Sequence, residues 1–346
     1  MKHLYVLAFA YLLLLLPSCK TDKPTVSGTS LRALEQMKQL ELTATTQRKY
    51  FYQSIPSASG LEYVQNFFYI VGDDSPFLYK LNEQFKLEQT YALFDTADFA
   101  TGRIPKAIKP DLESMAHFTY GRDEMLLLLG SGATDARNKG FLVNLSEGNA
   151  VRELNLSRFY TFLKRVLKLE TEGQLNLEGL AIDNTYTYLM QRPLGPGANV
   201  LIRFDSNDFK HFLMNDGAIP AAAVYHFELP SAEQHRASFS GAYTLGDKLF
   251  FTASIEDAPN AIEDGEVLGS FIGVIDLKAL PYATDALKPL TVPAVVIRNS
   301  DNSPYIGKAE SLVVMQGEEQ GFFKVIVVSD DDLGHSELLE LQLQVK

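Results

Sequence analysis

The chain has 346 residues, of which 46% are hydrophobic, so it can bury a large core and is not an intrinsically disordered protein. Its formal net charge is −12, and its Lys and Arg residues form no block. This excludes a nucleic acid polymer as the partner, because such a partner requires a basic face. The length fits one large all-β domain.

The first 18 residues have the pattern of a lipoprotein signal peptide. Lys2 and His3 precede a Leu-rich run, Leu4 to Leu16, which is too short to cross a membrane as a mature helix. The segment Leu16-Pro17-Ser18-Cys19 resembles a bacterial lipobox, in which cleavage before the Cys leaves that residue as a lipidated N-terminus. Cys19 is the only Cys in the chain, so it cannot form an internal disulfide. An ordinary secretory signal with a chance Cys is the alternative.

Lipidation at Cys19 would attach the protein to a membrane of the bacterial cell envelope, on an extracytoplasmic side. Residues 19–38, of which residues 20–30 are polar, are then expected to form a lipid-anchored tether. The domain that remains, residues 39–346, is predicted to be a single β-propeller for the following reasons.

From Leu40 onward, short apolar segments alternate with turn residues, which predicts a sandwich, a barrel or a propeller. One helix, Ser157 to Lys168, is expected to interrupt the strands. The clearest strand candidates are residues 67–71, 125–129, 186–190, 200–204, 248–252 and 324–328.

A repeated motif favours the propeller. Each copy places Glu or Ser after an apolar residue, and strand-like segments follow. The copies are Leu61-Glu62-Tyr63, Leu112-Glu113-Ser114, Leu177-Glu178-Gly179, Phe239-Ser240-Gly241 and Ala309-Glu310-Ser311, with central residues 51, 65, 62 and 70 positions apart. Repeats of this kind predict a five-bladed β-propeller with insertions in its loops. Six blades are the alternative, if Ala150 to Lys168 contains one. Either Leu40 to Ala44 or Lys49 to Tyr52 is expected to complete the last blade and close the ring.

The central residues of the motif are expected to converge on the propeller axis, because the first strand of each blade lines the channel. Several carboxylates this close require protons or a cation between them. Oxygen ligands favour Ca²⁺ over Zn²⁺, which prefers His and Cys. The predicted metal ligands are Glu62, Glu113, Glu178, Ser240 and Glu310. Alternatively, each Glu accepts hydrogen bonds from the backbone of the next blade and only locks the ring.

Cationic side chains near the motifs are candidates for binding a phosphate-bearing small molecule. Arg192 closes the second strand of the unit that begins at Glu178, and Lys109 and Lys308 each lie within four residues of a ring Glu. The alternative is that all three are solvated or paired with neighbouring carboxylates. Acidic loops at 256–257, 263–266 and 330–332 suggest a further cation site or a general base, although isolated acidic loops are commonly solvated. No catalytic residue can be assigned.

Three families resemble parts of this pattern. The ring is similar to that of the calcium-activated nucleotidases (apyrases), in which Glu and Ser from successive blades hold an axial Ca²⁺; Glu62 stands where this resemblance implies a Ser. The segments 178–182, 191–194 and 200–205 resemble phytase-like esterase propellers. The whole chain from about residue 45 resembles an uncharacterised family of bacterial secreted propellers, and the segments 105–113, 256–270 and 329–334 carry this likeness.

Two hypotheses follow. In the first, the protein is a Ca²⁺-dependent phosphohydrolase or esterase-like enzyme that uses the mouth of the channel. In the second, it is a non-catalytic binding or scaffold propeller whose metal only stabilises the ring. The fold by itself cannot decide between them, because activity depends on the site.

Overall fold

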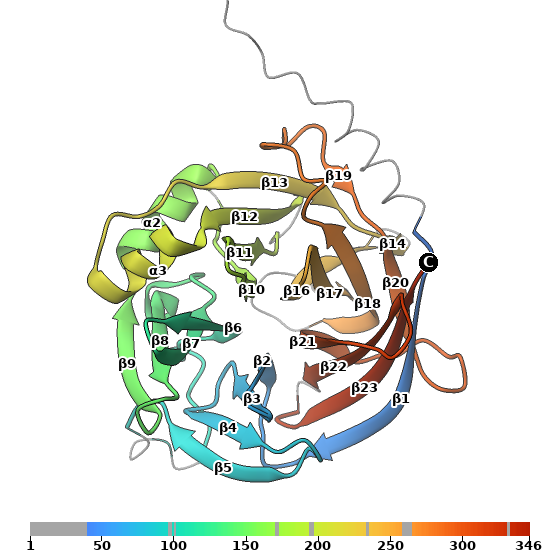
Figure 1. Ribbon diagram of the computed structural model, residues 1–346, viewed down its shortest axis with the longest axis horizontal. Coiled ribbons are helices and arrows are strands. Elements are labelled where there is room, and N and C mark those ends of the chain that lie inside the picture. Colours follow the sequence, from blue (N-terminus) through green and yellow to red (C-terminus); the bar gives the residue numbers. More distant parts are fainter. Residues whose placement is uncertain are drawn as a thin grey trace, which may run out of the picture.

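The computed structural model is an all-β propeller, in which sheets surround a central axis (Figure 1). It describes residues 40–346 except 96–98, 100–101, 170–172, 194–196, 233–234, 258–264 and 331–332. The proposed signal peptide and the whole of the proposed tether, including Cys19, lie outside the described residues. The all-β propeller prediction is confirmed.

The described strands group into five consecutive four-stranded units. The first unit is β2 (Ala58–Val64), β3 (Phe67–Gly72), β4 (Phe77–Leu81) and β5 (Leu87–Ala92). The second unit is β6 (Leu112–Tyr120), β7 (Asp123–Gly130), β8 (Lys139–Asn144) and β9 (Ala150–Asn155). The third unit is β10 (Leu177–Ile182), β11 (Tyr186–Gln191), β12 (Asn199–Asp205) and β13 (Ala223–Glu228), and the short β19 (Leu290–Thr291) pairs with its outer edge.

The last two units share one continuous sheet. The fourth unit is β16 (Ser238–Leu245), β17 (Lys248–Asp257), β18 (Glu266–Asp276) and β20 (Ala294–Arg298), and the fifth is β21 (Lys308–Gln316), β22 (Phe322–Asp330), β23 (Ser336–Val345) and β1 (Leu42–Tyr52). A small hairpin, β14 (Ser231–Ala232) and β15 (His235–Arg236), and a 3-10 turn, η1 (Asp135–Arg137), complete the non-helical elements.

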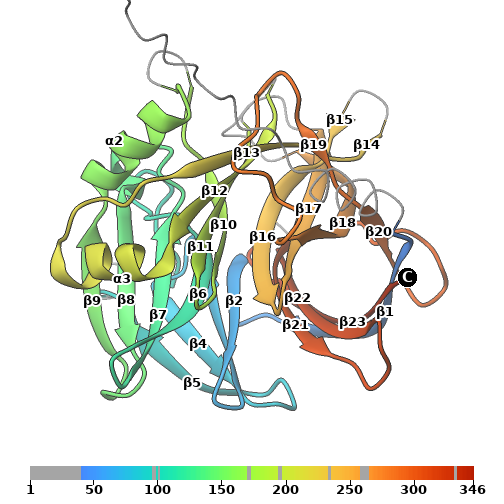
Figure 2. The same ribbon diagram turned by 45° about the horizontal axis from the view of Figure 1, so that its top comes forward.

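The first strands of the units surround the axis, as the view in Figure 1 shows. Each of β2, β6, β10 and β16 contacts the first strand of the next unit, and β21 contacts β2, so the ring is closed. Five clusters of buried apolar side chains lie between successive units, and every sheet therefore buries both faces. Figure 2 shows the same ring turned by 45° about the horizontal axis.

The N-terminal strand β1 closes the ring as predicted. It pairs antiparallel with β23 over most of its length and parallel with β20 at Ala44 and Thr45. Because β1 forms the outer strand of the last unit, residues from the two ends of the described chain complete one sheet.

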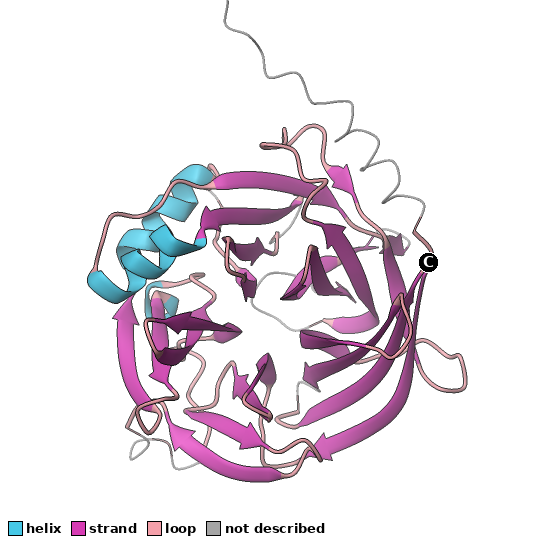
Figure 3. Ribbon diagram, in the orientation of Figure 1, coloured by secondary structure: helices cyan, strands magenta, loops and turns pink. Residues whose placement is uncertain are grey.

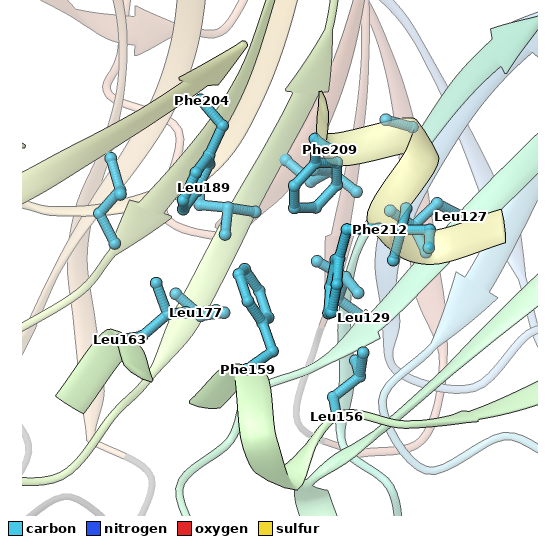
Figure 4. Close-up of a cluster of buried hydrophobic side chains, with 14 of the residues drawn as sticks. Leu127, Leu129, Leu156, Phe159, Leu163, Leu177, Leu189, Phe204, Phe209 and Phe212 are labelled. Atoms are coloured by element: carbon cyan, nitrogen blue, oxygen red, sulfur yellow. The ribbon is translucent and has the colours of Figure 1, made fainter. Parts of the chain in front are cut away.

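Two helices, α2 (Ser157–Val166) and α3 (Ser206–Asn215), lie outside the second and third units (Figure 3). Figure 4 shows how Phe159 of α2 and Phe209 and Phe212 of α3 pack with strand residues of both units, such as Leu129 and Leu189. Fully burying one such Phe stabilises the fold by about 1.5–3 kcal/mol. No helix in the described part of the chain is long and apolar enough to cross a membrane.

The helix predicted at Ser157 to Lys168 is present, two residues shorter at its C-terminal end. It follows β9, so residues 150–168 supply an outer strand and a helix instead of a further sheet. The helix α3 was not predicted. Its signal is Asp205, whose carboxylate accepts hydrogen bonds from the backbone N–H groups of Asn207 and Asp208 in the manner of an N-cap.

Candidate functional site

Each inner strand begins with a β-bulge. The register shifts by one residue at the same point of all five units, between Ala58 and Gly60 in β2 and at the corresponding places in β6, β10, β16 and β21. A bulged residue is left unpaired and its side chain is redirected. The five bulged residues are Ser59, Glu113, Glu178, Ser240 and Glu310, which we call the axial ring.

The first position of the axial ring differs from the sequence prediction. The bulge of β2 lies at Ser59, so Ser59 and not Glu62 is equivalent to the other four residues. The error arose because Leu61-Glu62 imitates the Leu-Glu of two other units, whereas the true parallel is Ser59-Gly60 with Ser240-Gly241 and Glu178-Gly179. The other four predicted metal ligands occupy equivalent positions.

The Gly that follows three ring residues allows the next unit to approach. A Cβ added at Gly241 would lie 2.5 Å from the carbonyl oxygen of Glu310 and 2.8 Å from Cα of Ser311, and one at Gly60 would lie 3.1 Å from Cβ of Met115. These are contacts between neighbouring inner strands, so a side chain at Gly60 or Gly241 would push the two strands apart.

Glu62 links two neighbouring units through hydrogen bonds from backbone N–H groups, which is the role given above as the alternative to metal binding. One of its carboxylate oxygens accepts from the backbone N–H of Tyr63 at 2.9 Å, and the other accepts from that of His117, in the next unit, at 3.0 Å. Glu62 is 7% exposed, and burial raises its pKa to about 7 although these hydrogen bonds oppose the shift.

Glu113 is the least compensated residue of the axial ring. Among the residues that the structure describes, none makes a hydrogen bond or ion pair with its carboxylate, which is partly exposed to the cavity described below. Its pKa is raised well above the ordinary value, first by burial and then by the negative charges of Asp111, Glu178, Asp73 and Glu310. The carboxylates therefore converge on Glu113, and a bound cation would relieve their repulsion.

Glu178 is held between a neutral and a charged partner. Its Oε1 accepts from Nδ2 of Asn176 at 2.5 Å and lies 3.7 Å from Nη1 of Arg192. Arg192 is also bound to Glu256 of the fourth unit, with 2.6 Å between Nη2 and Oε1. Arg192 therefore lies beside the axial ring, where it is paired with carboxylates, in line with the alternative interpretation.

Glu310 pairs with Lys308 of its own strand. The distance from Lys308 Nζ to Glu310 Oε1 is 2.9 Å, and both side chains are largely buried. Burial raises the pKa of Glu310 to about 8. The negative charge of Glu178 adds to this rise, and the positive charge of Lys308 opposes it. Lys308 therefore compensates the axial ring only in part.

A second acidic group lies beside Glu113. The carboxylates of Asp73, Asp111 and Glu113 have oxygens within 4.8 Å of one another, close enough to hold a metal ion. The ammonium of Lys109 already contacts two of them, at 2.8 Å from Asp111 Oδ1 and with a short contact to Asp73. Asp111 also pairs with Arg137 at 2.6 Å. Lys109 therefore acts here as an internal counter-ion.

A polar cavity of about 380 Å³ opens on one side of the axial ring. Ser59, Glu113 and Glu310 line it, whereas Glu178 and Ser240 do not. It is lined mainly by charged side chains of both signs: Arg103, Lys106, Lys109, Lys308, Asp73, Asp74, Glu113, Glu310 and Asp330. The cavity can therefore admit a small polar molecule next to the ring.

The acidic loops have different outcomes. Glu256 is buried in the pair with Arg192, contrary to the expectation of a solvated loop, and Asp330 lines the cavity. Residues 263–264 and 331–332 lie outside the described residues. Sequence reasoning also missed Asp73 and Asp111, for which no local pattern gives a signal.

The fold and the site define a β-propeller with an acidic, oxygen-rich channel mouth. Residues 54–343 match the family described as "Family of unknown function (DUF6929)", and the chain belongs to that family. No curated protein sequence gives a significant match.

Many solved structures resemble this fold, including the following three. Glutaminyl cyclase from Myxococcus xanthus has 14% identity and a TM-score of 0.47, with 88% of this chain and 97% of that one covered. An exo-1,5-α-L-arabinanase from a bovine ruminal metagenomic library has 10% identity and a TM-score of 0.46, covering 85% and 95%. The PQQ-bound aldose sugar dehydrogenase from Streptomyces coelicolor has 11% identity and a TM-score of 0.40, covering 88% and 99%. These values are too low to relate their sites to the present one.

Proposed function

We propose that this protein is an extracytoplasmic, lipid-anchored propeller that binds Ca²⁺ at the axial ring. The proposed ligands are the carboxylates of Glu113, Glu178 and Glu310 and the hydroxyl oxygens of Ser59 and Ser240. Of these, only Glu113 belongs to the described group of three carboxylates whose oxygens already lie within 4.8 Å of one another, so the other carboxylates must move inward to bind the same ion. The observation that carries the proposal is the Glu113 carboxylate, which has no partner among the described residues although other carboxylates surround it.

The chemistry of the donors favours a hard cation. All five ring side chains offer oxygen, which suits Ca²⁺ with its six to eight oxygen ligands, and the ring has no His or Cys to favour zinc. With Ser59 in the first position, the ring has the Ser that its resemblance to the calcium-activated nucleotidases implied.

The test compares two variants that make the same change in neighbouring inner strands. The full chain would be titrated with Ca²⁺ by calorimetry and melted in EDTA and in Ca²⁺. We expect the wild type to melt higher with Ca²⁺, because a ligand at 100 times its Kd stabilises the folded state by about 2.7 kcal/mol. Glu113→Gln should lose most of that rise and Glu62→Gln should keep it. The proposal would be refuted if the wild type had the same melting temperature in Ca²⁺ as in EDTA.

The second candidate is hydrolysis of phosphate esters or anhydrides with help from the metal. The cavity favours it, because Lys106, Arg103 and Lys308 line the space beside Glu113 and Glu310 and could hold an anion. When bound, the cation would neutralise charge on the phosphate. However, Lys308 is paired with Glu310 and Arg103 with Asp74, so an anionic ligand must compete with these carboxylates.

Turnover assays separate this candidate from a binding or scaffold protein. Nucleoside di- and triphosphates, phytate and a generic phosphoester would each be incubated with the full chain in Ca²⁺ and in chelator. Ca²⁺-dependent turnover supports the enzyme. If none is turned over while Ca²⁺ still raises the melting temperature, the hydrolase is rejected and the binding propeller stands.

The anchor is proposed from the sequence alone. Expression of the full chain and of Cys19→Ser in a bacterium would test it by membrane fractionation and by incorporation of labelled fatty acid. The wild type should carry the label and sediment with membranes, and Cys19→Ser should do neither. Unlabelled wild type would show that Cys19 is not lipidated.

A further inference from the structure

Glu256 forms a buried ion pair close to the axial ring. It lies near the end of β17, and its Oε1 accepts hydrogen bonds from Nη2 of Arg192 at 2.6 Å and from the hydroxyl of Ser254 at 2.9 Å. The Glu256 side chain is 10% exposed and that of Arg192 is 13% exposed. Burial opposes ionisation of Glu256, but the charges of Arg192 and Lys308 outweigh it and bring its pKa to about 2. Glu256 is therefore an anion at neutral pH.

Arg192 lies between two carboxylates, and Glu256 is the nearer one. Nη1 of Arg192 is 3.7 Å from Oε1 of Glu178, beyond hydrogen-bonding distance, whereas the contact to Glu256 is 2.6 Å. A buried guanidinium stays charged and requires a carboxylate partner. If Glu256 were neutral, Glu178 would be the nearest carboxylate with which Arg192 could form a close pair.

A close pair with Arg192 would weaken Glu178 as a cation ligand. A bidentate guanidinium occupies both carboxylate oxygens and places a positive charge beside the site, which repels a second cation. We propose that Glu256 is a positioning residue that holds Arg192 away from Glu178 and so keeps this carboxylate available for the metal. This inference rests on the proposed Ca²⁺ function of the axial ring.

A double-mutant cycle tests the inference. The Kd for Ca²⁺ would be measured calorimetrically for the full-length wild type, Glu256→Gln, Arg192→Gln and the double variant, and melting in EDTA would show that each is folded. We expect Glu256→Gln to weaken Ca²⁺ binding about tenfold or more. In the Arg192→Gln background, where no guanidinium can move, the same change should weaken binding by less than about threefold.

A control accounts for the lost negative charge. Glu153 lies on the outer strand β9 in an exposed ion pair with Lys139 at 3.0 Å, and Glu153→Gln should leave the Kd unchanged. Equal weakening by Glu256→Gln in both backgrounds would overturn the inference, since the effect would then not pass through Arg192. So would an unchanged Kd in Glu256→Gln. A wild type that binds no Ca²⁺ would instead refute the proposed function.

Discussion

Ser59 and Ser240 make the same contact in two different units of the propeller. Each hydroxyl donates a hydrogen bond to the backbone carbonyl of the residue that precedes the ring Glu of the next unit, Leu112 for Ser59 and Ala309 for Ser240, the latter at 2.5 Å. This shared contact, together with the bulge at both residues, shows that they occupy equivalent positions of the axial ring. The ring therefore reads Ser, Glu, Glu, Ser, Glu around the axis.

The equivalence predicts equal costs for removing either hydroxyl. Ser59→Ala and Ser240→Ala should each lower the free energy of unfolding by about 1–2 kcal/mol, because a buried carbonyl loses its donor. Ser114 offers a matched control, since its buried Oγ has no hydrogen-bond partner in the described part of the chain. Ser114→Ala should change stability by less than about 0.5 kcal/mol. Denaturant unfolding measures all three, and a loss in Ser114→Ala as large as the others would contradict the account.

Glu62 predicts that the metal-free protein becomes less stable as the pH rises. Its pKa in the folded protein is about 7, above the ordinary value of 4.5, so folding favours its protonated form. This contribution is fully present below pH 4.5 and is lost as the pH rises through 7, and it amounts to at most about 3 kcal/mol. Unfolding in denaturant with EDTA between pH 5 and 8 measures it. The decline should be smaller in Glu62→Gln, and parallel curves for the two proteins would exclude Glu62 as its source.

The close approach of the fourth and fifth units at Gly241 predicts that a side chain there would lower the free energy of unfolding. In Gly241→Ala the new Cβ would meet backbone atoms of Glu310 and Ser311 at 2.5 and 2.8 Å, which cannot move independently of β21. We expect a loss of about 1–3 kcal/mol in the free energy of unfolding. Gly269→Ala is the control, because its Cβ would have no atom within 4 Å. Similar stabilities for the two variants would show that the inner strands can separate freely.

The burial of Ala44 between β23 and β20 predicts that closure of the ring depends on β1. Ala44 is 2% exposed and lies between Leu343 of β23 and Ile297 of β20, so Ala44→Glu places a charge in an apolar cluster. It should lower the free energy of unfolding by about 3 kcal/mol or more. The neighbouring Thr43 is exposed on the same strand, and Thr43→Glu should stay within about 0.5 kcal/mol of wild type. An Ala44→Glu protein as stable as Thr43→Glu would mean that β1 is dispensable for closure.

The sequence located four of the five axial-ring residues but misplaced the first. Glu113, Glu178, Ser240 and Glu310 share one position because a repeated fold repeats its local constraints, and these leave a pattern in the sequence. In the first unit the pair Leu61-Glu62 matched that pattern better than Ser59-Gly60. Only the strand register shows that the bulge lies at Ser59.

The all-β propeller and its closure by an N-terminal strand were determined by the sequence itself, through short apolar segments, turn residues and a repeating motif. Only the tertiary structure decided the partners of the charged side chains. Arg192, which follows β11, meets Glu256 of β17, and Lys109, which precedes β6, meets Asp73, which follows β3. Such pairs follow from how sheets pack around an axis, and ion pairing between distant segments leaves no periodic trace in a chain. The charge that surrounds Glu113 is therefore a property of the closed ring, even though Glu113 itself could be found from the sequence.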